Sequence, residues 1–190
     1  MVQLVLSTAV FCALHSLLAL DSVKRKVADR PGAARWYRLA YSLLSTLLLG
    51  WVVLAYLHAD TEPPYWVLSP WLTVLAWALV VGGAALSGLA VMRFGAAGFL
   101  GLVPEQSTGL VRTGMHGRMR HPIYTGIIGA LAGWVLLHAT PATLVVVGIQ
   151  ALYLPIGIHL EERKLIAAFG EEYQRYRREV PALIPRLGSR

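Results

Sequence analysis

Five long runs of apolar residues, none interrupted by a charged residue, constrain this chain more than any other feature. The runs are Val2–Leu20, Leu39–Leu57, Trp71–Met92, Pro122–His138 and Ala142–Leu160. Most have about the 20 residues that a helix needs to cross a hydrocarbon core of roughly 30 Å. Because the 190-residue chain is 56% hydrophobic, a soluble globule could not bury all of them. The sequence therefore predicts an all-α, polytopic membrane protein with five transmembrane helices.

The composition and the motifs exclude several other classes of protein. Only 14% of the residues are charged, whereas soluble domains carry about a quarter. The single cysteine, Cys12, lies within the first apolar run, so an intrachain disulfide or a CxxC site is impossible. The chain also lacks the glycine-rich dinucleotide and phosphate loops, the GxSxG elbow and the HExxH zinc motif. A soluble enzyme, a disulfide scaffold and a disordered regulator are thus excluded.

The positions of the basic residues predict the topology. All 17 Lys and Arg lie in 24–38, 93–120 and 163–190. With five spans these segments share one side, which the positive-inside rule assigns to the cytoplasm. The N-terminus is then outside, and a short C-terminal helical segment is cytoplasmic. The formal net charge of +7 is explained by topology and contact with the lipid bilayer, so no nucleic-acid partner is expected.

Two features within the apolar runs suggest how the helices meet. Gly126, Gly129 and Gly133 form a small-residue face on the fourth run, where a neighbouring helix can approach closely. His15 and Ser16 make a polar step in the first run. They are candidates for a substrate pocket, although Ser and His also make hydrogen bonds that simply pack membrane helices.

The first cluster of candidate functional residues comes directly before the fourth run. Arg120 and His121 precede Pro122, and proline is favoured in the first turn of a helix. The free N–H groups and the positive dipole end of that helix favour an anion or a carboxylate. The alternative is that Arg120 only fixes the topology and that His121 only begins the helix.

The second cluster ends the fifth run, where Glu161 and Glu162 are expected at the membrane boundary near Arg120. Ionisable side chains at this depth need partners and are functional candidates, although ordinary exposed ion pairs are the alternative. The helix is expected to continue to a C-cap at Gly170. His159 and Glu162 share a helix face, but the thiolates or repeated Glu-x-x-His elements of a metal site are missing, so no metal is expected.

The two clusters, in this order and spacing, resemble the integral-membrane methyltransferases related to isoprenylcysteine carboxyl methyltransferase. The similar elements are Leu110-Val111-x-x-Gly114, Arg120-His121-Pro122-x-Tyr124-x-Gly126, Glu161-Glu162-x-x-Leu165-x-x-x-Phe169-Gly170-x-x-Tyr173-x-x-Tyr176 and Val180-Pro181-x-x-Ile184-Pro185. The first half is similar to the NnrU branch of this family, through His15-Ser16-Leu17-Leu18-Ala19 and Arg35-Trp36-Tyr37-Arg38. That branch also resembles bacterial methanethiol S-methyltransferases.

The resemblance implies a single membrane domain over residues 1–190, with a three-helix part, 1–101, and a part that binds S-adenosylmethionine, 102–190. It implies catalytic roles for Arg120, Glu161 and Glu162. The cofactor-binding residues that it implies are Leu110, Val111, Gly114, His116, Arg120, His121, Pro122, Tyr124 and Glu162. His116 departs from the pattern, since the family commonly has an aromatic residue, usually tyrosine, at that position.

Chemistry agrees with these implied roles. A sulfonium cation favours a nearby carboxylate, which Glu161 or Glu162 can supply, and the carboxylate of the cofactor favours Arg120 and His121. Arg120 can alternatively orient a carboxylate substrate. A thiol acceptor must react as its thiolate, and the candidate bases are His121, His116 and His15.

The resemblance therefore implies S-adenosylmethionine-dependent methyl transfer, and a bacterial inner membrane is the expected location. The acceptor is apolar or membrane-embedded: a small thiol, an isoprenylcysteine-like carboxylate or a lipid amine. The main alternative is a non-enzymatic scaffold or assembly factor that keeps the fold. A sterol-reductase-like enzyme using NADPH ranks last, since it would need further basic residues for a 2′-phosphate.

Overall fold

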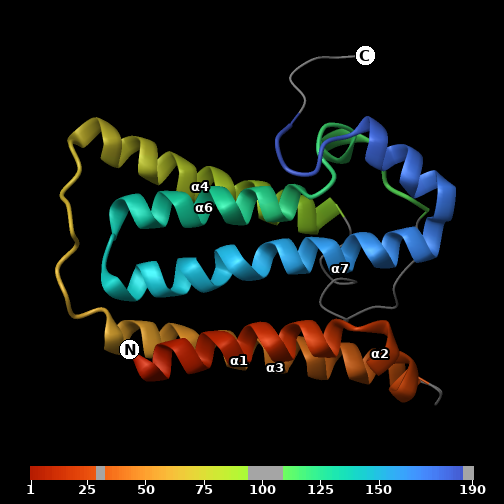
Figure 1. The fold of residues 1–190 in the computed structure, drawn as a ribbon, viewed down its shortest axis with the longest axis horizontal. Coiled ribbons are helices and arrows are strands. Elements are labelled where there is room, and N and C mark those ends of the chain that lie inside the picture. The colour runs from red at the N-terminus through yellow and green to blue at the C-terminus, as the bar shows by residue number, and fades with distance from the viewer. Residues whose placement is uncertain (29–32, 94–108, 186–190) are drawn as a thin grey trace. The chain divides into compact units, whose positions relative to one another are not determined.

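A computed structural model describes residues 1–28, 33–93 and 109–185, and these are helical without any strand. Figure 1 shows the helices in chain order. They are α1 (Val2–Ala19), α2 (Asp21–Ala28), α3 (Ala33–Ala59), α4 (Pro70–Arg93), the 3-10 helix η1 (Gly114–Gly117), α6 (Pro122–Leu137) and α7 (Pro141–Glu179). The predicted all-α class is confirmed for these residues.

Among the described residues, four helices are long and apolar enough to cross a membrane, which supports an integral membrane protein. They are Val2–Ala19, Trp36–Ala59, Pro70–Arg93 and Pro141–Glu179. The fourth predicted span corresponds to α6, which is apolar but has only 16 residues. At 1.5 Å per residue α6 is about 24 Å long, shorter than the roughly 30 Å of a hydrocarbon core. The count of five spans therefore stays a prediction.

The described residues form two compact units. The first contains 1–67 and 138–153, and the second contains 68–93, 109–137 and 154–185. Helix α7 contributes its first part to the first unit and the rest to the second. The predicted boundary between 1–101 and 102–190 falls outside the described residues.

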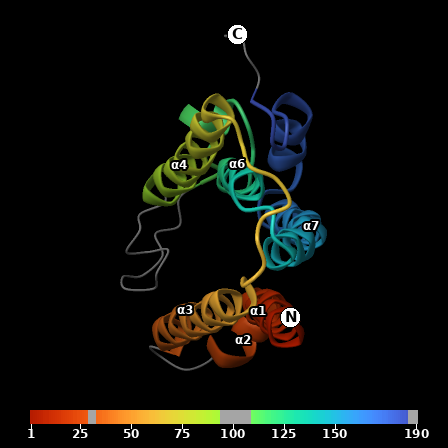
Figure 2. The same cartoon turned by 90° about the vertical axis from the view of Figure 1, so that its left-hand side faces the viewer.

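In the first unit, α1 and α3 lie side by side with α2 next to them (Figure 2), and the beginning of α7 belongs to the same unit. Its core is formed by Leu4, Val52, Ala55 and Ala142. Helix α7 begins where the hydroxyl of Thr140 accepts the N–H of Thr143 at 3.2 Å. Thr140 thus caps the first turn of the helix, and the Pro141 that follows has no N–H group that would be left unsatisfied there.

In the second unit, α4 and α6 approach each other through small residues. A Cβ added at Gly133 would lie 2.5 Å from the carbonyl oxygen of Ala76, and one at Gly126 would collide with Gly83 and Ser87. At Gly129 the nearest atom would be 3.9 Å away, an ordinary contact. The predicted small-residue face is thus confirmed, with Gly126 and Gly133 at the close approach.

Helix α7 is interrupted at Gly170, and the blue ribbon in Figure 1 shows a sharp bend in this helix. Gly170 has φ 51° and ψ −127°, a conformation that L side chains rarely adopt. The predicted end of the helix at this glycine is confirmed, and a second helical segment follows it as far as Glu179. Because of this bend, side chains before Gly170 can contact side chains after it.

Candidate active site

Glu162 is the centre of the charged cluster in the second unit. Its Oε1 accepts from Arg120, at 3.0 Å from Nε and 2.7 Å from Nη2, and lies 3.2 Å from Nε2 of His121. Its Oε2 lies 3.2 Å from Nε of Arg177. Glu162 is only 8% exposed, and a carboxylate at such a depth is tolerated only when cations or hydrogen-bond donors surround it.

Arg120 also holds the end of α7. Its Nη1 donates to the carbonyl oxygens of Arg177, at 2.8 Å, and of Val180. These carbonyls lie at the C-terminal end of the helix, where the last carbonyl groups have no intrahelical N–H partner and a cation is favourable. One guanidinium therefore joins the Glu162 carboxylate to the last turn of α7.

The backbone beside Arg120 holds the segment that follows α7. The N–H of Arg120 donates to the carbonyl of Pro181 at 2.9 Å, and the N–H of His121 donates to that of Ala182 at 3.0 Å. Two adjacent N–H groups before α6 are thus satisfied by the C-terminal segment. This pairing holds the backbone from which the side chains of Arg120 and His121 reach Glu162.

His121 and Glu161 complete the cluster. His121 is 3% exposed, and its Nδ1 lies 3.6 Å from Oε2 of Glu161. The ring of Tyr124 meets that of His121 edge-on, with centroids 5.7 Å apart. The Glu161 side chain remains 46% exposed, whereas that of Glu162 is 10% exposed. The two adjacent glutamates therefore differ in accessibility.

The turn η1 brings His116 into the second unit. His116 is buried, and its carbonyl oxygen accepts the hydroxyl of Tyr176 at 2.6 Å. Burial, followed by the positive charge of Arg93, lowers the pKa of His116 below its usual value. The imidazole is therefore neutral near pH 7. Gly114 begins η1 with φ 64°.

Leu110 and Val111 line an open depression, which is formed largely by the segment that precedes η1 in the chain. Its other lining residues are Arg93, Gly109, Arg112 and Thr113. Nη2 of Arg93 donates to the hydroxyl of Thr113 at 3.0 Å, which ties the end of α4 to this segment. Pro122 is buried in the first turn of α6, as its sequence position predicted.

His15 and Ser16 belong to the first unit. The hydroxyl of Tyr41 lies 3.0 Å from Nδ1 of His15, and that of Ser45 lies 3.3 Å from the same nitrogen. The Ser16 hydroxyl lies 2.7 Å from that of Tyr153. These hydrogen bonds connect helices, in agreement with the packing alternative, and the substrate-pocket role stays a prediction.

Sequence reasoning missed Arg177 and Arg112. Arg177 contacts Glu162, and Nη2 of Arg112 donates to Glu179 at 3.4 Å. The guanidinium of Arg112 also lies 5.8 Å from the ring centroid of Tyr176. Arg177 binds across the bend at Gly170, so the glycine was the signal that could have pointed to it, whereas the Arg112 side chain binds the segment after the bend.

Metal ligands do not gather in the described ranges: these contain no group of three or more His, Cys, Asp or Glu side chains able to hold an ion. The site is defined by ion pairs and hydrogen bonds instead.

The comparisons with known proteins fit this arrangement. The model of the NnrU protein family matches residues 3–185. The chain belongs to the NnrU family. No solved structure matches it.

Curated relatives extend the comparison to enzymes. Methanethiol S-methyltransferase 2 of Bradyrhizobium diazoefficiens is 31% identical over 194 residues, covering 92% of this chain and 73% of the relative. Methanethiol S-methyltransferase of Pseudomonas sp. is 31% identical over 187 residues, covering 93% and 70%. Protein-S-isoprenylcysteine O-methyltransferase of Schizosaccharomyces pombe is 36% identical over 77 residues, covering 40% and 33%. The chain is a methyltransferase by these relationships.

Proposed function

We propose that this protein transfers a methyl group from S-adenosylmethionine to a small apolar thiol. The observation that carries the proposal is the extent of the match. Five relatives named methanethiol S-methyltransferase align with about nine-tenths of the chain. A further relative of that name aligns with 38%, and the isoprenylcysteine O-methyltransferase aligns with 40%. The first half of the chain is therefore shared with those five thiol enzymes.

The donor set of the second unit suits this methyl donor. S-adenosylmethionine supplies, when bound, an electrophilic methyl group on a sulfonium cation. The carboxylates of Glu161 and Glu162 lie beside the guanidinium of Arg120 and the imidazole of His121, so the site offers groups for both charges of such a ligand. The residues proposed to hold it are Leu110, Val111, Gly114, His116, Arg120, His121, Pro122, Tyr124 and Glu162.

The contacts divide the two glutamates into different proposed roles. Glu162 already accepts from Arg120 and also lies beside His121 and Arg177. The more exposed Glu161 keeps the capacity to face a cation. We assign Glu161 to the sulfonium, and Glu162 and Arg120 to holding the site in shape, because positioning supplies much of the rate of a transfer between two bound partners.

The proton of a thiol acceptor needs a neutral base, since the thiolate is the nucleophile. His116, whose pKa is lowered by burial, is neutral near pH 7. His121 is bonded to Glu162, and His15 belongs to the first unit. We propose His116 as the first base to test.

The proposed setting is the bacterial inner membrane, with the N-terminus outside and the C-terminal helical segment in the cytoplasm. Helix α6 is proposed as the fifth span of a single domain in contact with the lipid bilayer. Bacterial relatives and four membrane-length helices support this setting. The acceptor would then reach the site from the bilayer.

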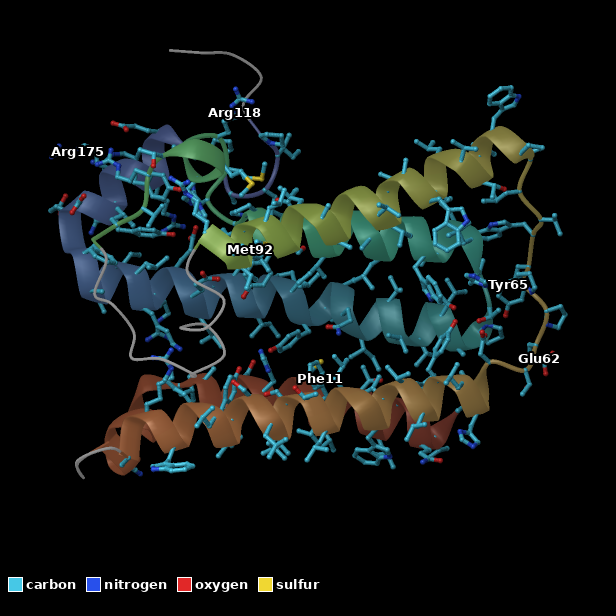
Figure 3. The ribbon with its side chains drawn as sticks, turned by 180° about the vertical axis from the view of Figure 1, so that it is seen from behind. Phe11, Glu62, Tyr65, Met92, Arg118 and Arg175 are labelled. Carbon is cyan, nitrogen blue, oxygen red and sulfur yellow. The ribbon has the colours of Figure 1, made fainter. Side chains whose placement is uncertain are left out.

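The test is calorimetric titration of S-adenosylmethionine and S-adenosylhomocysteine into the detergent-purified chain, followed by methyl transfer to methanethiol. We expect micromolar binding that Glu162→Gln weakens and that Arg175→Ala preserves. Arg175 is a matched control because it is exposed at the surface (Figure 3). A folded wild type that binds neither molecule would overturn the proposal and leave the scaffold alternative.

A further inference from the structure

Tyr173 carries an unusual buried hydroxyl. The residue is 0% exposed, and among the described residues its hydroxyl has no hydrogen-bond partner. Buried polar atoms are nearly always bonded, and leaving one without a partner costs the desolvation of that group. A hydroxyl kept in such a place therefore calls for an acceptor that is bound separately.

The surroundings of this hydroxyl are those of the charged cluster. The phenol interacts electrostatically with Glu162, Arg120 and Glu161. The bend at Gly170 makes this possible, because Tyr173 lies in the helical segment after the bend and Glu162 lies before it. The unpaired donor thus belongs to the part of the second unit where the proposed cofactor residues gather.

We propose that the Tyr173 hydroxyl donates a hydrogen bond to the bound methyl donor. This inference rests on the proposed function and adds a binding residue to the site. The ligand class is an adenosyl amino acid, which offers carboxylate oxygens, ribose oxygens and ring nitrogens as acceptors. A neutral phenol can donate a hydrogen bond to any of these acceptors without adding a charge to a cluster whose charges are already paired.

The chain supplies a matched control three residues away. Tyr176 is also buried, and its ring meets that of Tyr173 edge-on with centroids 5.8 Å apart. Its hydroxyl, however, donates to the carbonyl of His116 at 2.6 Å. The same loss of one oxygen atom therefore removes an existing bond at Tyr176 and no protein bond at Tyr173.

The experiment compares Tyr173→Phe with Tyr176→Phe, using S-adenosylhomocysteine as the probe. Calorimetry measures its dissociation constant, and thermal unfolding of the ligand-free protein in detergent measures stability. We expect Tyr173→Phe to weaken binding about 5- to 10-fold, the usual value of one net hydrogen bond, while the Tm without ligand stays equal or rises. We expect Tyr176→Phe to lower that Tm.

Two results would overturn the inference while leaving the proposed function intact. In the first, the wild type binds the probe and Tyr173→Phe binds it equally well, so a buried water or nothing at all meets the hydroxyl. In the second, Tyr173→Phe lowers the Tm without ligand as much as Tyr176→Phe does, so the hydroxyl already has a partner. If the wild type binds no probe, the proposed function fails and the inference fails with it.

Discussion

The two units hold their segments together with different kinds of polar contact. In the first unit, bonds between neutral groups join the helices, such as Ser16 with Tyr153 and Tyr56 with Thr143, and the carboxylate of Asp60 accepts from the neutral hydroxyl of Thr140. In the second, Glu162 is bound by the cationic Arg120 and Arg177. A neutral bond between membrane helices is worth about 0.6 kcal/mol, whereas breaking a buried ion pair costs about 3–5 kcal/mol. The charged groups that chemistry needs therefore coincide with the contacts that stability needs.

Replacing Arg120 is expected to give the largest effect. Arg120→Ala leaves the Glu162 carboxylate without its closest cation and releases the carbonyls of Arg177 and Val180. We expect a loss of about 3–5 kcal/mol of unfolding free energy and a fall of about 100-fold or more in methyl transfer. Denaturation in detergent and a methyl-transfer assay measure the two effects.

Arg120→Lys separates charge from geometry. A lysine keeps the positive charge but cannot reach both the carboxylate and the two carbonyls, so an intermediate stability is expected. An Arg120→Ala protein with the stability and turnover of the wild type would remove the contrast between the units.

The close approach of α4 and α6 comes next in size. Gly133→Ala would place a methyl group 2.5 Å from the Ala76 carbonyl, so the helices must separate. We expect a loss of about 1–3 kcal/mol of unfolding free energy. Gly129→Ala is the matched control one turn away, since its methyl group would meet only ordinary contacts. Equal stabilities of the two variants would contradict the close packing.

Local sequence signals predicted much of the second unit. The small-residue face with Gly126 and Gly133 follows from helical spacing. Pro122 begins its helix and Gly170 interrupts its helix because of their own backbone preferences. Glu162 near Arg120 followed from the expected depth of both residues. Each of these depends on properties that a short stretch of sequence carries.

The contact between Glu162 and Arg177 could not be predicted, because it depends on the tertiary arrangement of the chain and not on any short stretch of sequence. In a straight helix Arg177 would lie about 22 Å from Glu162, at 1.5 Å for each intervening residue. The bend at Gly170 reduces the distance between the two side chains to 3.2 Å. A C-cap glycine predicts that a helix ends, but the direction in which the chain continues is set by tertiary contacts.

A smaller effect is expected in the first unit. Tyr153→Phe removes the hydroxyl that meets Ser16 and leaves the ring in place. We expect a loss of about 0.6 kcal/mol of unfolding free energy and near wild-type methyl transfer. If methyl transfer falls by tenfold or more at unchanged stability, the polar groups of the first unit act on the substrate. The predicted pocket at His15 and Ser16 would then replace the packing interpretation.

The smallest effect is expected at His116, as a dependence of stability on pH. Its pKa in the folded protein lies below the usual 6.5, because burial and the charge of Arg93 disfavour the imidazolium. The unfolded chain therefore binds the proton first, so the stabilising contribution is complete above about pH 6.5 and is lost as the pH falls through the folded pKa. His116→Gln should lose less Tm than the wild type between about pH 7.5 and pH 5.5. Parallel Tm curves for the two proteins would show that His116 is not a buried neutral group. The charged cluster around Glu162 would then account for the acid sensitivity of the second unit, and the case for His116 as the base would be lost.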